Sequence, residues 1–145
     1  MSGHTVTISK SILVVEDSPA QCELLSQALA QHGFEEALHI EHGIAPALTY
    51  LSHQLEDRAP LPRLILVDLK LMSGSGIDIV RDMRRHKRLH LVPVVILTTS
   101  DVQHDIDAAY ISGANGYVVK PGTYSDLVKL MGDLCRFWLG WNRTA

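Results

Sequence analysis

The sequence predicts an α/β fold in which a doubly wound sheet of five parallel strands is covered by five helices. Of its 145 residues, 46% are hydrophobic but only 6% are aromatic, so aliphatic side chains must build the core, as they do in sheets covered by helices. From Ser11 onward, short apolar runs alternate with longer amphipathic stretches, which is the pattern of repeated strand-then-helix units. A chain of this length buries one core, so we expect one domain.

The first two strand-and-helix units occupy the amino-terminal half. Ile12 to Val15 is the clearest strand, and Ser18 follows as the N-cap of a helix that ends at Gly33. Ala37 to Ile40 is a weaker second strand, and the helix after it fades into the polar stretch His53 to Ala59.

Three further units follow, each with a short buried strand and an amphipathic helix. The remaining strands and helices are, in chain order, Leu64 to Val67, Ile77 to Arg85, Pro93 to Leu97, Asp101 to Ile111, Tyr117 to Val119 and Tyr124 to Trp138. We therefore expect residues 1–10 to form an N-terminal tail, residues 11–136 the folded domain and residues 137–145 an aromatic C-terminal extension.

Charge and composition exclude several classes of function. A formal net charge of −3 leaves no general basic surface for the phosphates of DNA or RNA. The densest basic run is either a solvated helix end or a partner contact. Its members are Arg81, Arg84, Arg85, Lys87 and Arg88.

The cellular compartment follows from the cysteines and from the absence of targeting segments. Cys22 and Cys135 lie far apart inside helical patterns, which suits two reduced thiols better than a disulfide or a metal site. No signal peptide and no apolar run of about 18 residues is present. We therefore expect a cytoplasmic protein without a membrane contact.

Polar residues follow four of the predicted strands. Glu16 and Asp17 come after the first strand, Asp68 after the third, Thr98 ends the fourth and Lys120 follows the fifth. In an open parallel sheet the carboxyl ends of the strands converge on the crevice that binds ligands. We expect these side chains to form one site.

The chemistry of that site follows from its charges. Three carboxylates in one crevice repel each other unless a cation neutralises them, and oxygen ligands alone favour Mg²⁺ over zinc. Lys120 supplies a second positive charge, and the two cations suit an incoming phosphoryl group. Asp68 is then the nucleophile that forms an aspartyl-phosphate, and Thr98 is a hydroxyl donor beside it.

The four segments that carry these residues resemble the signatures of response-regulator receiver domains of two-component systems. They read Val14-Val15-Glu16-Asp17-Ser18, Leu66-Val67-Asp68-Leu69, Ile96-Leu97-Thr98-Thr99-Ser100 and Val119-Lys120-Pro121. The resemblance covers residues 11–136 and implies a flavodoxin-like sheet with strand order 2-1-3-4-5. It also implies a signalling protein that assists its own Mg²⁺-dependent phosphorylation and dephosphorylation without being a turnover enzyme.

The same resemblance implies a role for each matching residue. Asp17, Asp68 and the backbone carbonyl of Lys70 would bind Mg²⁺, with Glu16 contributing through water. Lys120 would pair with a phosphoryl oxygen.

Two residues would then report the phosphoryl group. Thr98 would move inward to hydrogen-bond it, and Tyr117 would turn inward as a switch aromatic. The alternative for Tyr117 is a core aromatic at the sheet edge.

The end of the chain is similar to that of stand-alone response regulators that partner bacterial phytochromes. That similarity implies a sensor histidine kinase, namely a phytochrome, as the upstream partner. It also implies a homodimer through the fourth helix, fifth strand, fifth helix and the C-terminal extension. Phe137, Trp138 and Trp141 would be interface anchors, unless this helix end folds back on its own core. No effector domain follows in the sequence, so we expect output through protein contacts.

Two departures from the family pattern stand out. The loop from Lys70 to Gly76 lacks the usual proline and contains two glycines, so we expect it to be more flexible. An excess of residues between Ser52 and Pro62 predicts a solvated loop.

Rival interpretations remain open. A phosphohydrolase of the haloacid-dehalogenase type also uses a strand-end Asp, but it needs a second Asp where this chain has Lys70. A flavin-binding module would need a phosphate cradle where Glu16 and Asp17 would repel the phosphate. A phosphate-independent receiver-like adaptor would lack one of the key charged residues. The eight histidines are expected at the surface, and none is close in sequence to the acidic site.

Overall fold

The computed structural model describes residues 11–145, so the predicted tail of residues 1–10 lies outside the described residues. The strands are β1 (Ile12–Val15), β2 (Leu38–Glu41), β3 (Leu64–Val67), β4 (Lys70–Leu71), β5 (Gly74–Ser75), β6 (Val94–Thr98) and β7 (Gly116–Val119). The helices are α1 (Pro19–Ala30), α2 (Ile44–Glu56), α3 (Gly76–Arg84), α4 (Gln103–Ser112) and α5 (Tyr124–Cys135). Three shorter turns complete the chain: η1 (Glu35–Ala37), η2 (Leu89–Leu91) and the π-helical η3 (Arg136–Trp141).

The main sheet has five parallel strands in the order β2-β1-β3-β6-β7. Counted among these five strands alone, this order is 2-1-3-4-5, which confirms the predicted flavodoxin-like topology. Each connection from one strand of this sheet to the next along the chain contains a helix, as parallel pairing requires. The polar residues after each strand therefore meet at one edge of the sheet.

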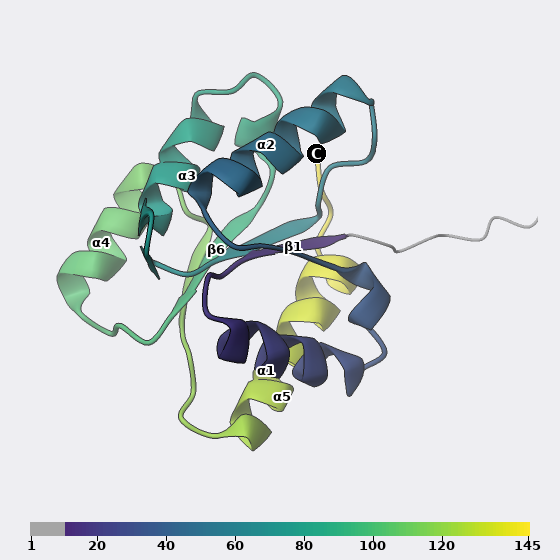
Figure 1. Cartoon of the computed structure of the whole chain (residues 1–145), viewed down its shortest axis with the longest axis vertical. Coiled ribbons are helices and arrows are strands. Elements are labelled where there is room, and N and C mark those ends of the chain that lie inside the picture. Colours follow the sequence, from purple (N-terminus) through teal and green to yellow (C-terminus); the bar gives the residue numbers. More distant parts are fainter. Residues whose placement is uncertain (1–10) are drawn as a thin grey trace, which may run out of the picture.

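Helices cover both faces of the sheet (Figure 1). Side chains alternate along each strand, so Leu13 and Val15 of β1 pack with α2, α3 and α4, whereas Ile12 and Val14 pack with α1 and α5. Both layers are aliphatic, as the low aromatic content predicts. Among residues 11–145, no helix is long and apolar enough to cross a membrane.

Two helix ends differ from the sequence prediction by three residues each. Helix α1 ends at Ala30 rather than Gly33, and Gly33 takes its positive φ of 75° in the turn that follows. The last helix was expected to run to Trp138, but α5 ends at Cys135 and continues as the wider η3 turn. The amide of Asn142 closes this turn on the carbonyl of Phe137, a five-residue spacing typical of a π-helix.

The loop after Asp68 is folded as a short antiparallel hairpin of β4 and β5. A Cβ on Gly76 would lie 2.2 Å from the carbonyl oxygen of Asp68 and 2.6 Å from Val67 Cγ1. Only glycine allows this close approach. The amide of Gly76 also donates to the carbonyl of Leu69 at 2.8 Å. The loop that contains the two glycines is therefore folded as a hydrogen-bonded turn.

Candidate functional site

The register of the sheet brings the ends of four strands to the same edge. Val15 pairs with Val67, and Thr98 pairs with Val119. Glu16, Asp68 and Lys120 each come directly after one of these paired residues. The amide of Asp68 donates to the carbonyl of Val15 at 3.1 Å, which extends the ladder to the first residue of the site.

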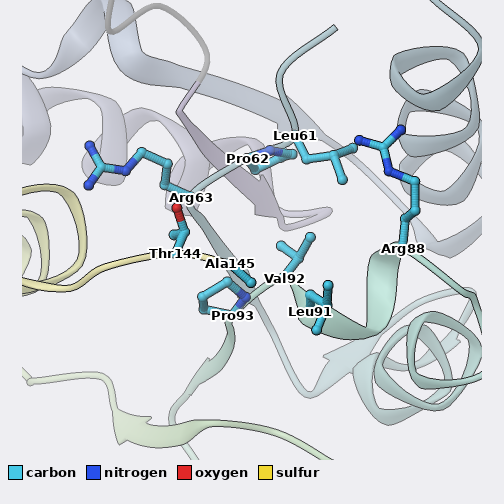
Figure 2. A pocket seen from close by; sticks show the side chains of 9 residues that line it. All are labelled: Leu61, Pro62, Arg63, Arg88, Leu91, Val92, Pro93, Thr144 and Ala145. Carbon is cyan, nitrogen blue, oxygen red and sulfur yellow. The ribbon is translucent and has the colours of Figure 1, made fainter. Parts of the chain in front are cut away.

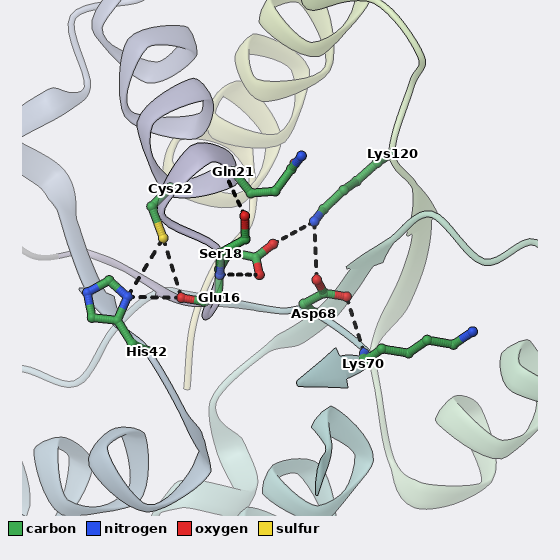
Figure 3. A network of polar contacts seen from close by, with 8 residues as sticks. All are labelled: Glu16, Ser18, Gln21, Cys22, His42, Asp68, Lys70 and Lys120. Carbon is green, nitrogen blue, oxygen red and sulfur yellow. Dashed lines mark hydrogen bonds and ion pairs between the residues drawn. The ribbon is translucent and has the colours of Figure 1, made fainter. Parts of the chain in front are cut away.

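Lys120 lies between two carboxylates (Figure 3). Its Nζ is 2.7 Å from Glu16 Oε1 and 3.3 Å from Asp68 Oδ2. The Glu16 side chain is 2% exposed and that of Asp68 16% exposed. Burial raises the pKa of the Glu16 carboxyl, although Lys120 opposes this shift. Asp68 is thus the more accessible of the two paired carboxylates.

Asp17 and the β4–β5 hairpin close another side of the site. Asp17 Oδ2 accepts a hydrogen bond from the amide of Met72 at the hairpin tip, and Asp68 Oδ1 accepts one from the amide of Lys70 at 3.3 Å. The Lys70 ammonium extends away from Asp68 (Figure 3). The carboxylates are therefore held by hydrogen bonds and by Lys120.

The donor chemistry of the site fits a hard divalent cation, because every available ligand atom is an oxygen. Within residues 11–145, however, no three His, Cys, Asp or Glu side chains are arranged to hold a metal ion. The contacts above explain this: Lys120 joins Glu16 to Asp68, and Asp17 faces Met72. A metal bound by Asp17 Oδ2 would share that oxygen with the Met72 amide.

Thr98 and Tyr117 lie on the two strands beyond Asp68. Thr98 ends β6 and is buried, and its carbonyl accepts the amide of Lys120 at 2.7 Å. The Tyr117 hydroxyl donates to the carbonyl of Ser100 at 2.9 Å, in the loop that follows Thr98. Burial raises the pKa of Tyr117. This hydrogen bond ties the predicted switch aromatic to the loop after β6.

The structure adds two residues that sequence reasoning missed. The Cys22 thiol donates to the backbone carbonyl of Glu16 at 3.3 Å, and Nδ1 of the exposed His42 lies 3.1 Å from the same oxygen. Because a carbonyl oxygen only accepts, both groups must donate to it. Val15 pairs with Glu41, so the polar residue after the second strand was the signal that could have identified His42.

The aromatic residues at the C-terminus separate into two groups. Trp138 packs against the core beneath α1 and α5, and its ring meets Phe137 edge-on at 5.1 Å. Phe137 is 50% exposed and Trp141 81% exposed. Trp138 therefore folds back on the core, as the alternative expected, whereas Phe137 and Trp141 face outward. The interface role of the exposed rings stays a prediction.

The arrangement can present one accessible carboxylate beside a fixed ammonium. Such a pair suits attack on an electrophilic phosphorus, since the ammonium offsets charge on the phosphoryl oxygens. The side chain two residues after Asp68 is an exposed lysine. The second Asp that a haloacid-dehalogenase-type hydrolase needs is therefore missing from this position.

Comparisons with known proteins agree on one family. The family model for the response regulator receiver domain matches residues 12–131. The response regulator Rcp1 of Synechocystis sp. is 34% identical over 90% of this chain and 89% of its own. The "Probable methanogenesis regulatory protein FilR2" of Methanothrix harundinacea is 35% identical over 92% of this chain and 86% of its own.

Solved structures show the same fold. The Mn²⁺-bound form of Rcp1 superposes with a TM-score of 0.80 at 33% identity, covering 94% of this chain and 99% of that one. The phosphorylated cyanobacterial phytochrome response regulator RcpA gives a TM-score of 0.83 at 30% identity, covering 94% and 98%. These proteins therefore share the fold of this chain over most of its length.

Proposed function

This chain belongs to the response regulator receiver domain family and is homologous to the phytochrome response regulators, and from that premise we propose that Asp68 accepts a phosphoryl group from a sensor histidine kinase. The observation that supports this most directly is the position of Lys120, whose Nζ lies 3.3 Å from Asp68 Oδ2. Phosphorylation is proposed to act as a signal through a conformational change. The protein is not proposed to turn over a substrate as an enzyme.

In the proposed reaction, a carboxylate oxygen of Asp68 attacks the phosphorus of the phosphohistidine on the kinase. A phosphorus–oxygen bond forms as the phosphorus–nitrogen bond breaks, and the leaving imidazole takes a proton from solvent. Lys120 offsets negative charge on the transferred oxygens, while Glu16 holds the ammonium from its buried side. Partial exposure of Asp68 permits the approach of the donor.

We assign a divalent cation to the same site, with Mg²⁺ as the physiological ion. Asp17, Asp68 and the Lys70 carbonyl would hold it, and Glu16 would contribute through water. When bound, it would add positive charge against the phosphoryl oxygens. The Mn²⁺-bound structure of Rcp1 supports a divalent ion in a relative, and the oxygen donors of this chain support Mg²⁺.

Phosphorylation is proposed to change the shape of the face formed by α4, β7 and α5. Thr98 would hydrogen-bond the new phosphoryl oxygens, which shifts the loop containing Ser100. Because Tyr117 donates to the Ser100 carbonyl, this shift would release or reorient its ring. The result is a population change between two packings of the same face.

The proposed upstream partner is a phytochrome histidine kinase, and the proposed assembly is a homodimer through α4, β7, α5 and residues 137–145. The relatives Rcp1 and RcpA support the kinase class. We place the protein in the cytoplasm, without nucleic-acid or membrane contacts, and keep residues 11–136 as the receiver unit. Two free cysteines suit a reducing compartment.

Incubation with Mg²⁺ and acetyl phosphate tests the central claim. Intact mass spectrometry should show one added phosphoryl group on the native protein and none on Asp68→Asn. Asp101→Asn, which changes an exposed aspartate in the next loop, should gain the group as the native chain does. An equal gain on Asp68→Asn, or no gain on the native protein, would refute the assignment.

A further inference from the structure

The loop between α3 and β6 carries three exposed cations without acidic partners. We call residues 85–91 the basic loop; Arg85, Lys87 and Arg88 in it are all exposed. Within residues 11–145 none of the three forms an ion pair, although Asp82 lies one helical turn before Arg85. Unpaired charges on one short loop are available to a partner.

The basic loop is held firmly from inside by Arg84. The Arg84 guanidinium donates to the carbonyls of Gly113 at 2.8 Å, His90 at 3.1 Å and Val92 at 3.0 Å, and to Asn115 Oδ1 at 2.8 Å. Hydrogen bonds from a charged group are stronger than neutral ones. This half-buried arginine therefore fixes both the end of the basic loop and the turn after α4.

His86 fixes the start of the same loop. Its Nδ1 accepts the amides of Arg88 at 3.0 Å and Leu89 at 3.2 Å, and Leu89 is buried in the core. The His86 side chain therefore caps two backbone amides of the loop. The backbone beneath the cations is thus ordered before any partner arrives, which reduces the entropy lost on binding.

A small cavity adjoins the basic loop (Figure 2). Its volume is about 200 Å³, and it is lined by Leu61, Pro62, Arg63, Arg88, Leu91, Val92, Pro93, Thr144 and Ala145. Sites for whole small molecules usually measure about 300–1,000 Å³. The size of this cavity suits a single side chain. Leu61, Leu91 and Val92 offer it apolar contacts, and Arg63 and Arg88 lie beside them in the lining.

We propose that the basic loop and this cavity together bind an acidic peptide segment of another protein. One apolar side chain of the peptide enters the cavity, and flanking carboxylates meet Arg85, Lys87 and Arg88. Charge complementarity favours this partner, because Arg85, Lys87 and Arg88 are three exposed cations on one short loop. The net charge of −3 over the whole chain disfavours the longer polyanionic backbone of nucleic acid. A two-fold contact of this loop with itself would place like charges together.

The position of the surface separates it from phosphorylation. Strand β6 begins at Val94, beside the cavity, and ends at Thr98, beside the acidic site. The basic loop therefore lies at the opposite end of the sheet from Asp68. A peptide bound there leaves the acidic site open, so this inference does not depend on the proposed function.

Fluorescence anisotropy with a labelled synthetic peptide tests the proposal. The probe contains one leucine flanked by glutamates, and a second probe replaces that leucine with serine. The native protein should bind the leucine probe more tightly, and Arg85→Glu with Arg88→Glu should weaken binding at least about tenfold. Lys129→Glu on α5 with Arg136→Glu at the start of η3 makes the same change of net charge elsewhere and should leave binding unchanged. Arg85→Gln with Arg88→Gln is the milder variant if the charge reversal impairs folding.

Several results would overturn the proposal. The native protein could fail to bind the leucine probe, or it could bind the serine probe with equal affinity. The variant of Lys129 and Arg136 could lose as much affinity as the variant of Arg85 and Arg88. Tighter binding of a DNA duplex of equal charge would assign the basic loop to nucleic acid. Loss of dimer in the Arg85 and Arg88 variant, measured by sedimentation, would assign it to a second copy of the chain.

Discussion

At the scale of single residues, the three acidic side chains of the site have different environments. Glu16 is buried against Lys120, Asp17 accepts the Met72 amide, and Asp68 keeps part of its carboxylate exposed. All three are strand-end carboxylates in the sequence, and nothing in their local pattern ranks them by accessibility. Their surroundings favour Asp68 as the reactive one.

The raised pKa of Glu16 predicts a pH-dependent stability term. Burial raises this pKa above its usual 4.5, so the folded chain binds the proton more tightly than the unfolded chain. The resulting stabilisation of the folded state is fully present below pH 4.5 and is lost as the pH rises through the raised pKa. In metal-free urea titrations, the stability of the native protein relative to Glu16→Gln should fall over that interval, by at most about 1.4 kcal/mol per pH unit. The stability of the native protein relative to Glu36→Gln, at an exposed position, should not depend on pH in this way. A native protein that becomes more stable relative to Glu16→Gln as the pH rises would contradict the prediction.

His42 should act as a positioning residue for the acidic turn. His42→Ala removes one of two side-chain donors to the Glu16 carbonyl, so the turn that carries Asp17 loses part of its support. Loss of a residue that supports the metal ligands without touching the metal typically weakens metal binding by 10–100-fold. We therefore expect His42→Ala to bind Mn²⁺ about tenfold more weakly in calorimetry. His104→Ala, exposed on α4, is the control. Loss of stability without loss of Mn²⁺ affinity would show that His42 has only a structural role.

At the scale of elements, the β4–β5 hairpin determines how the acidic site is closed. Its tip supplies the Met72 amide to Asp17, and its end packs the backbone of Gly76 against Asp68. The sequence pattern indicated a flexible loop here, because glycines permit many conformations. The structure uses one of them for a close backbone contact, which a sequence pattern does not reveal.

Gly76→Ala should therefore destabilise the domain. Its new Cβ would lie 2.2 Å from the Asp68 carbonyl oxygen, and the backbone must move to relieve the clash. Overpacking of this kind costs about 1–3 kcal/mol, which urea denaturation would measure. Gly122→Ala meets nothing within 4 Å and should be close to neutral. Equal stability of the two variants would show that the hairpin relaxes freely.

At the scale of the whole molecule, the C-terminal segment divides between folding and assembly. Trp138 contributes to the core, while Phe137 and Trp141 face solvent. Exposed aromatic rings near one another often anchor protein interfaces. Phe137 and Trp141 are thus suited to the proposed dimer interface, whereas Trp138 belongs to the core.

Replacing the two exposed rings should separate these roles. Phe137→Ser with Trp141→Ser should weaken the proposed dimer by about tenfold or more in sedimentation equilibrium, with little change in the unfolding midpoint. Trp138→Ser should instead lower stability. Met72→Ser removes an exposed apolar side chain elsewhere and should leave assembly unchanged. A dimer that survives the double replacement would place the interface on another face.

The sequence by itself determined the five parallel strands, their order through family resemblance, and which polar residues follow them. These features depend on local patterns: apolar runs define strands, and parallel strands bring their carboxyl ends to one edge. Both the fold and the family were predicted in this way and are confirmed. The roles of the site residues stay predictions.

Only the tertiary structure decided how those residues meet. Lys120 contacts Glu16 across 104 positions of sequence and Asp68 across 52, and His42 reaches Glu16 across 26. Such contacts depend on strand register, on side-chain rotamers and on the path of the β4–β5 hairpin, none of which has a local signature. The role of Arg84 also has no local signature. In the sequence it is one of several neighbouring basic residues, whereas in the structure its hydrogen bonds hold the end of the basic loop.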